Sequence, residues 1–79
     1  GDYGVDLIAE KETRRIAIQC KKYSKPVPNK AVQEIIAGAS MYYANEMVVV
    51  SNTEYTKAAM ILAEQHGVIL LHHDVLNNL

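Results

Sequence analysis

The sequence has little cysteine, no long hydrophobic run and no excess of charge of either sign. Its single cysteine, Cys20, excludes an internal disulfide, and without a secretory signal pattern we expect a cytoplasmic protein. No apolar stretch approaches the roughly 18–20 residues that cross a bilayer, so we expect no membrane insertion. Eight Lys and Arg against nine Asp and Glu give a formal net charge of -1, which excludes a polybasic arm and an acidic disordered tail.

The size of the chain limits the core that it can form. Its 79 residues, 49% of them hydrophobic, suit one globular domain over residues 1–79. A chain of about 80 residues buries only about 60–65% of its unfolded surface, so such a domain is often marginally stable. We therefore expect a homodimer, or a further segment that completes the core.

Two alternating segments near the start of the chain predict a β-hairpin. Apolar and polar residues alternate over residues 4–10 and 15–21, and the polar residues 11–14 between them suit a turn. If Glu10 pairs with Arg15 across this turn, the numbers of paired residues sum to 25.

The rest of the chain alternates between helix and strand patterns. The expected elements are a helix capped by Asn29 that carries Val32, Ile35, Ile36, Ala39 and Tyr43, a strand at 47–50 covered on both faces, a helix at about 54–66 capped by Thr53 and ended by Gly67, and a buried strand at 68–71. The order is then β-β-α-β-α-β. It predicts an α/β fold, with a mixed sheet of about four strands and flanking helices.

The predicted hairpin brings three polar side chains to one face of the sheet. In the register above, Asp6 lies opposite Gln19, and Lys21 shares their face. A carboxylate and an ammonium on a half-covered sheet are costly unless they are paired, so the arrangement is either a simple cross-strand pair or a reactive site. Taken alone, the pattern does not decide between the two.

Longer motifs carry a resemblance to a known family. The segments GDYGVDL, IQCKKY, AVQEIIAGA, VVVSNTEYTKAA and GVILLHHDVL strongly resemble, in order and spacing, the catalytic domain of Mrr-like restriction endonucleases, a branch of the PD-(D/E)xK nuclease superfamily. The resemblance runs over almost the whole chain. It implies a restriction-endonuclease-like core that lacks the first helix of the family, which leaves open whether the domain is truncated at its N-terminus.

The resemblance also implies the chemistry. Asp6 matches the metal-binding aspartate, Gln19 the residue that other members have as Glu, Cys20 the position whose backbone carbonyl faces the metal, and Lys21 the catalytic lysine. These matches imply a Mg²⁺-dependent (or Mn²⁺-dependent) endonuclease that hydrolyses DNA phosphodiester bonds without a small-molecule cofactor. Mg²⁺ prefers hard oxygen ligands, and Gln19 supplies one negative charge fewer than Glu, so we expect weak metal binding.

Further residues are candidates for contacts with DNA. Lys22, Tyr23, Lys25 and Lys30 form a basic segment directly after the predicted catalytic strand, although ordinary solvated lysines would look the same. Gln33 lies one helical turn past the Asn29 cap. The remaining candidates, Ser51 and Asn52, lie where a strand meets a helix and could equally serve as caps.

Two other features are expected to be structural. Cys20 shares its face with apolar neighbours and is predicted to be a packed thiol. Adjacent side chains on a strand point to opposite faces, so His72 and His73 should not share a metal ion, and Asp74 should cap a final turn.

Two alternatives to the nuclease remain open. A DNA-binding module without catalysis would bind DNA whether or not a chelator is present. A structure-specific nuclease resembling Holliday-junction resolvases would use two sites of a dimer on a branched substrate.

Overall fold

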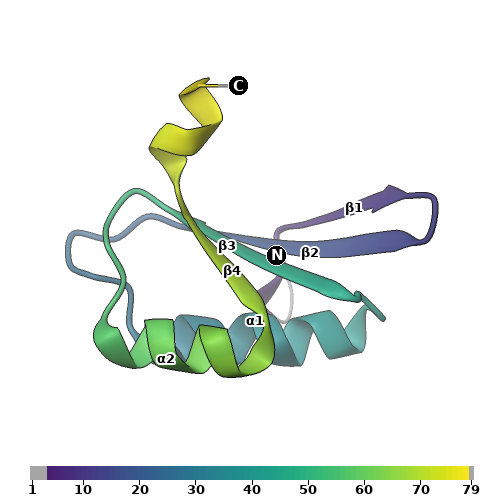
Figure 1. The fold of residues 1–79 in the computed structure, drawn as a ribbon, viewed down its shortest axis with the longest axis horizontal. Helices are drawn as coiled ribbons and strands as arrows, with labels where there is room; N and C mark the ends of the chain where they lie inside the picture. The colour runs from purple at the N-terminus through teal and green to yellow at the C-terminus, as the bar shows by residue number, and fades with distance from the viewer. Residues whose placement is uncertain (1–3, 79) are drawn as a thin grey trace.

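The computed structural model describes residues 4–78, and its elements follow the predicted β-β-α-β-α-β order (Figure 1). They are β1 (Leu7–Lys11), β2 (Arg14–Lys21), α1 (Asn29–Met41), β3 (Glu46–Ser51), α2 (Lys57–His66), β4 (Val68–His72) and a closing 3₁₀ helix, η2 (His73–Asn78). The mixed α/β sheet is therefore confirmed. No helix within this described part of the chain is long and apolar enough to span a membrane.

The hairpin has the predicted register. β1 runs antiparallel to β2 and Glu10 pairs with Arg15, so paired residues sum to 25. The strand begins at Leu7, however, and not at residue 4, because Gly4 adopts a left-handed conformation with φ of +72°. Asp6 still follows the hairpin, since its backbone N–H donates to the carbonyl oxygen of Ile18 at 2.9 Å.

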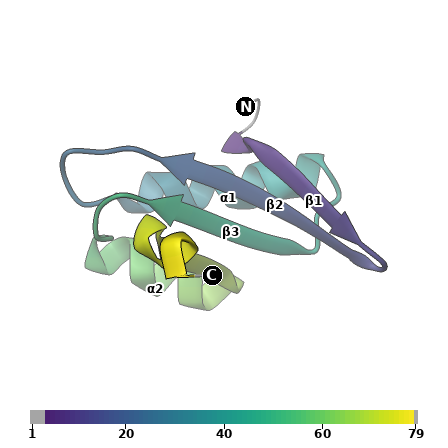
Figure 2. The same cartoon turned by 90° about the horizontal axis from the view of Figure 1, so that it is seen from above.

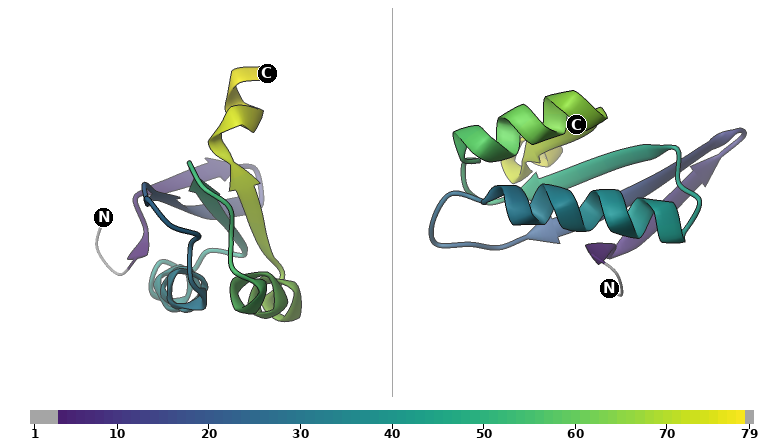
Figure 3. Two further views of the ribbon diagram at one scale, coloured as in Figure 1. Left: turned by 90° about the vertical axis from the view of Figure 1, so that its left-hand side faces the viewer. Right: turned by 90° about the horizontal axis from the view of Figure 1, so that it is seen from below.

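The four strands form one sheet in the order β1-β2-β3-β4, with β2, β3 and β4 parallel to one another. Both α1 and α2 pack on the same face of this sheet, which we call the helix face (Figures 1 and 3). Figure 2 views the sheet from the other side, with the strands in front of both helices. The buried core lies between these layers and consists of Val5, Ala17, Val32, Ile35, Ala39, Val49, Ala59, Ala63 and Val68.

The opposite side of the sheet, which we call the open face, is covered by neither α1 nor α2, and η2 rises from it at the end of β4 (Figures 1 and 2). Side chains alternate along a strand, so Ala17 points to the helix face whereas Ile18 and Cys20 point to the open face. The prediction that Cys20 is a packed thiol is therefore wrong, because its residue is exposed. Both faces of β2 carry apolar residues, and the sequence pattern could not show which of them the helices cover.

The inner strand β3 is fully covered on its helix face and only partly covered on its open face. Val49 is fully buried against the helices, and on the open face Val48 is partly exposed whereas Val50 is buried at 9% exposure. The expectation that this apolar run is covered on both faces is therefore correct at Val50 and wrong at Val48. On the same face Leu7 and Ile69, in the two outer strands, are 56% and 49% exposed.

The predicted helix starts need correction, while one predicted helix end is confirmed. Asn29 is the first residue of α1, and Pro28 is its N-cap without a side-chain hydrogen bond. The N-cap of α2 is Thr56 and not Thr53, because the Thr56 hydroxyl accepts a backbone N–H of the first turn. Gly67 ends α2 in the left-handed conformation, as predicted.

The apolar stripe of α1 is confirmed for most of its members. Val32, Ile35 and Ala39 are buried in the core, and Ile36 packs against it. Tyr43 is an exception, since the helix ends at Met41 and Tyr43 is 88% exposed. Its φ of +56° lies in the left-handed region, in the turn between α1 and β3.

Candidate functional site

The hairpin joins Asp6 and Gln19 in a hydrogen-bonded cluster. Gln19 Nε2 lies 3.1 Å from Asp6 Oδ2 and 3.2 Å from the carbonyl oxygen of Cys20, and it donates to both. The backbone N–H of Cys20 donates to the same Asp6 oxygen at 2.8 Å. One amide group therefore bridges a carboxylate oxygen and a carbonyl oxygen that converge on one point.

Gln19 is unusual because it is almost completely buried while half of its amide is unsatisfied. The residue is 8% exposed, and its Oε1 has no hydrogen-bond partner among the described residues. A buried polar atom without a partner costs free energy, about 1–3 kcal/mol for a neutral group. Such atoms often mark a place where a ligand completes the bonding.

The Asp6 carboxyl group is held in its charged form. The backbone N–H of Cys20 lowers the pKa of Asp6 below its ordinary value, and the positive charge of Lys21 adds to this shift. A carboxylate that stays ionised is the form that can bind a cation.

Lys21 lies at the end of β2 on the helix face, and its partner comes from α1. Its Nζ is 3.0 Å from Glu34 Oε1, and only 15% of the Lys21 side chain is exposed. The ammonium also lies 5.8 Å from the centre of the Tyr23 ring, within the range of a cation–π contact. Glu34 thus holds the amine at a defined place next to the Asp6–Gln19 pair.

The residue of α1 that reaches Lys21 is Glu34, which the sequence analysis did not single out. Gln33 is exposed and its side chain makes no hydrogen bond with another described residue, whereas its neighbour Glu34 reaches Lys21. Ala31 and Gly38 are both buried, and Glu34 lies three and four residues from them, at the edge of the buried stripe. That spacing was the signal that could have identified Glu34.

The basic segment after β2 is anchored at its start. The Asn52 side chain accepts the backbone N–H of Tyr23 at 2.8 Å and donates to the Tyr23 carbonyl oxygen at 3.0 Å. Farther along, Val27 is buried and pairs with Tyr55 in an isolated bridge. Lys22, Lys25 and Lys30 remain exposed around these anchors.

Ser51 and Asn52 have structural tasks. Ser51 is buried, and its hydroxyl accepts the backbone N–H of Thr53 at 3.1 Å. A surface hollow of about 520 Å³ lies beside them, and its lining includes Lys21, Lys22 and Asn52. It does not include Asp6 or Gln19, so this hollow and the carboxylate–amide pair are separate features that meet at Lys21.

Comparison with known families identifies the family of this domain. A family model described as restriction endonuclease, the Mrr catalytic domain, matches residues 1–79. The chain belongs to the Mrr-type restriction endonuclease family. Asp6, just before β1, therefore meets Gln19 and Cys20 of β2 within a domain of this nuclease family, with Lys21 at the end of the same strand.

A solved structure shares the fold of this Mrr-type domain. It is the crystal structure of a protein of unknown function, AF1548, at 23% sequence identity and a TM-score of 0.73. The similarity covers 89% of the present chain and 41% of that protein. A comparison with curated proteins finds no match.

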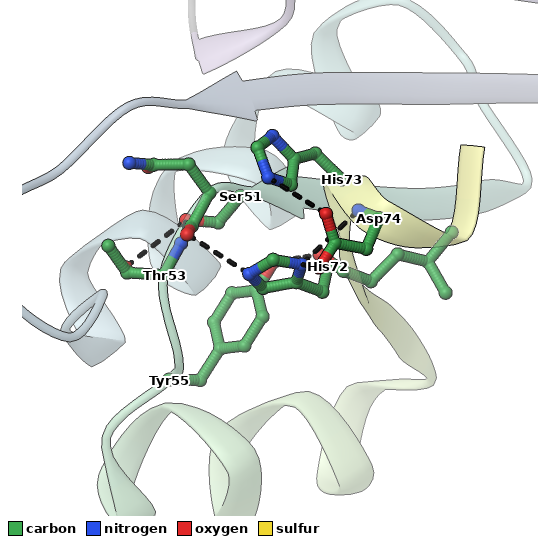
Figure 4. Close-up of polar contacts among 8 residues, drawn as sticks. Ser51, Thr53, Tyr55, His72, His73 and Asp74 are labelled. Atoms are coloured by element: carbon green, nitrogen blue, oxygen red, sulfur yellow. Dashed lines mark hydrogen bonds and ion pairs between the residues drawn. The ribbon is translucent and has the colours of Figure 1, made fainter. Parts of the chain in front are cut away.

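At the end of β4, the Mrr-type domain gathers a second group of polar side chains that sequence reasoning had set apart. The metal-ligating atoms of His72, His73 and Asp74 lie within 4.8 Å of one another (Figure 4). The prediction that the two histidines point to opposite faces is wrong because β4 ends at His72, and the 3₁₀ turn of η2 begins at His73.

Proposed function

We propose that the protein is a metal-dependent DNA endonuclease that hydrolyses phosphodiester bonds with Mg²⁺ or Mn²⁺. The observation that carries this proposal is the Gln19 amide, which bridges the Asp6 carboxylate and the Cys20 carbonyl in a domain of the restriction endonuclease family. The domain would span residues 1–79. Asp6, Gln19 and Lys21 would be its catalytic residues.

The residues present fit a hard divalent cation. Asp6 offers an anionic oxygen and Cys20 a carbonyl oxygen, and both converge on the Gln19 amide nitrogen. Rotating that amide by half a turn would exchange Nε2 for Oε1, which at present has no partner. Three oxygen ligands would then replace the bridge, in keeping with the preference of Mg²⁺ and Mn²⁺.

The metal ion, Lys21 and Glu34 would have distinct roles in hydrolysis. When bound, the divalent ion would supply a Lewis acid for the phosphate and a more acidic water molecule. Lys21 would stabilise negative charge that develops on the phosphate or orient the attacking water. Glu34 acts as a positioning residue, because its carboxylate holds the Lys21 amine at 3.0 Å.

The basic segment would hold the DNA backbone. Lys22, Lys25 and Lys30 are exposed and follow the strand that carries Lys21, so they could contact successive phosphates. Tyr23 is anchored by Asn52, which leaves its ring available for stacking or its hydroxyl for a phosphate. Gln33 is exposed on α1 and could add a further contact, whereas the burial of Ser51 makes it a weaker candidate.

We also propose that the domain works as a homodimer in a reducing compartment such as the cytoplasm. The open face exposes apolar side chains of both outer strands, and a second copy could cover them. The exposed thiol of Cys20 on that face suits a reducing environment. Analytical ultracentrifugation at micromolar concentration tests the dimer, and a compact monomer would contradict it.

A plasmid assay tests the nuclease. Supercoiled DNA is incubated with the protein and Mg²⁺, Mn²⁺ or EDTA, and the nicked and linear products are measured. We expect metal-dependent cleavage that Lys21→Ala lowers by at least about a hundredfold, the range typical of a lost charge-stabilising group. Lys11→Ala is the matched control, because Lys11 is an exposed lysine at the far end of the same hairpin.

The outcomes separate the candidate functions. Cleavage that survives in Lys21→Ala would assign the activity to a contaminant and refute the proposed site. DNA binding that ignores EDTA, with no cleavage in either metal, would favour a DNA-binding module. Faster cleavage of a four-way junction than of linear duplex would favour a structure-specific resolvase activity.

A further inference from the structure

A group of three metal-ligating side chains lies at the junction of β4 and η2. His72 Nδ1 is 3.4 Å from Asp74 Oδ2, and His73 Nε2 is 3.2 Å from Asp74 Oδ1 (Figure 4). The two imidazole rings lie edge to face with their centres 4.7 Å apart. One carboxylate is thus contacted by two imidazoles, one at each of its oxygens.

These separations match the edges of a small coordination polyhedron. Bond lengths of about 2.0–2.2 Å in a tetrahedral zinc site place neighbouring ligand atoms roughly 3.3–3.6 Å apart. Both nitrogen–oxygen distances are close to that range and end on the two different oxygens of Asp74, so the carboxylate would bind the ion through both of them. Ligand atoms of the three residues lie within 4.8 Å of one another. A small rotation of the exposed His73 ring would bring its nitrogen into place.

The hydrogen bonding of His72 prepares it to be a ligand. Its Nε2 lies 3.0 Å from the carbonyl oxygen of Asn52, which can only accept, so Nε2 carries the proton. The lone pair is therefore on Nδ1, the atom that faces Asp74. Metal-ligating histidines commonly donate their second N–H to a backbone carbonyl in this way.

We propose that His72, His73 and Asp74 bind a first-row transition-metal ion of the Zn²⁺ class through two imidazole nitrogens and one carboxylate. A water molecule would complete the coordination, because the site is open to solvent. The backbone N–H of Asp74 donates to His72 Nδ1 at 3.2 Å, and the ion would replace that contact. Two nitrogen donors favour zinc, nickel or copper over Mg²⁺.

This site is separate from the proposed nuclease centre and does not depend on DNA cleavage. It uses residues from the end of β4, whereas Asp6 and Gln19 belong to the hairpin at the other side of the sheet. The two sites approach each other at the 520 Å³ hollow, which His73 lines together with Lys21 and Lys22 but which neither Asp6 nor Gln19 reaches. A bound ion would link the end of β4 to the start of η2 and add positive charge beside the basic segment.

Zinc titration followed by calorimetry and by ¹H–¹⁵N NMR tests the proposal. We expect one Zn²⁺ per chain, with shift changes centred on His72, His73 and Asp74 that excess Mg²⁺ does not reverse. His73→Gln and Asp74→Asn should each weaken binding at least about tenfold, since each removes a direct ligand. Both residues are exposed, so these variants should stay folded.

Two controls make the test decisive. His66→Gln removes the third histidine of the chain, which is exposed at the end of α2, and should leave zinc affinity unchanged. Asp6→Asn should also leave it unchanged. Equal zinc affinity in wild type and His73→Gln, or no saturable binding to folded protein, would overturn the proposal. Binding lost in Asp6→Asn instead would assign the ion to the nuclease centre and likewise overturn it.

Discussion

Gly4 packs directly against Glu34 of α1. A Cβ at Gly4 would lie 2.8 Å from the Glu34 carbonyl oxygen and 2.9 Å from the Glu34 Cβ, too close for any side chain. The same Glu34 holds Lys21 through its carboxylate. One helix residue therefore fixes both the segment that leads to Asp6 and the amine beside it, and α1 sets the spacing between the two.

The contact at Gly4 predicts a large effect of a single methyl group. Gly4→Ala should lower the free energy of unfolding through the left-handed φ of +72°, at about 1–2 kcal/mol, and through the clash, at about 1–3 kcal/mol more. Urea denaturation followed by circular dichroism measures the change.

Gly67 offers the matched control for this prediction. Its φ of +70° is nearly the same, but a Cβ there would meet nothing within 4 Å. Gly67→Ala should therefore show the conformational cost alone, about 1–2 kcal/mol. Equal losses in the two variants would contradict the close packing at Glu34.

Gln19→Glu should strengthen binding of Mg²⁺ at the proposed nuclease centre. Affinity for hard cations rises with the number of charged ligands, so we expect a gain of at least about tenfold, or about 1.4 kcal/mol. Without metal, the new carboxylate would face Asp6 and should lower stability. Calorimetric titration measures the affinity, with Gln33→Glu as a control at an exposed position of α1. A gain of the same size in the control would show a general charge effect only.

The lowered pKa of Asp6 predicts a loss of stability in acid. The folded-state pKa lies below the unfolded value of about 3.9, so the contribution of this carboxylate is present above that pH and fades as the pH falls through the folded-state value. The urea midpoints of wild type and Asp6→Asn should differ at pH 7, and the difference should shrink as the pH falls below the unfolded-state pKa and through the folded-state value. Glu64→Gln, an exposed change on α2, should show no such pattern. A difference in urea midpoint that stays constant at all pH values would show that the Asp6 carboxylate is not stabilised in its ionised form.

Tyr55 should be a stability residue of the sheet. Its hydroxyl lies 3.0 Å from the Val49 carbonyl oxygen and 2.8 Å from that of Leu71, so it links β3 to β4. Tyr55→Phe should cost about 1–2 kcal/mol of unfolding free energy, whereas Tyr43→Phe at an exposed position should cost nothing measurable.

Burial raises the pKa of Tyr55 to about 12, so the contribution of its hydroxyl to stability is present below pH 10 and is lost as the pH rises toward 12. Alkaline titration of tyrosine absorbance in wild type and Tyr55→Phe checks the raised pKa of Tyr55.

Local pattern and turn chemistry predicted most of the fold. The alternation on both sides of the KETR turn set the hairpin register, and the register alone placed Asp6 opposite Gln19. The helix starts were harder to predict, because Asn29 and Thr53 are as suitable for caps as the residues that do cap. The choice between them depends on tertiary contacts such as the bridge of Val27 with Tyr55.

Only the part of the candidate site that depends on strand pairing, namely Asp6, Gln19 and Lys21, was predicted from the sequence. A pairing register reports which side chains share a face, but it does not say which face the helices cover, and Cys20 was misplaced for that reason. Contacts between a helix and a strand need the rotation of the helix as well, so Glu34 was missed. The grouping of His72 and His73 was missed because alternation stops where a strand ends.

The double hydrogen bond between the Asn52 side chain and the Tyr23 backbone has a consequence for binding kinetics. The Asn52 side-chain amide bonds both the N–H and the C=O of Tyr23, as a neighbouring peptide group would in an extension of the parallel β2–β3 pairing. The backbone directly after β2 is therefore already ordered in the free protein. In the proposed complex with DNA, little of this segment would need to become ordered on binding, so Asn52→Ala should lower the association rate more than it raises the dissociation rate.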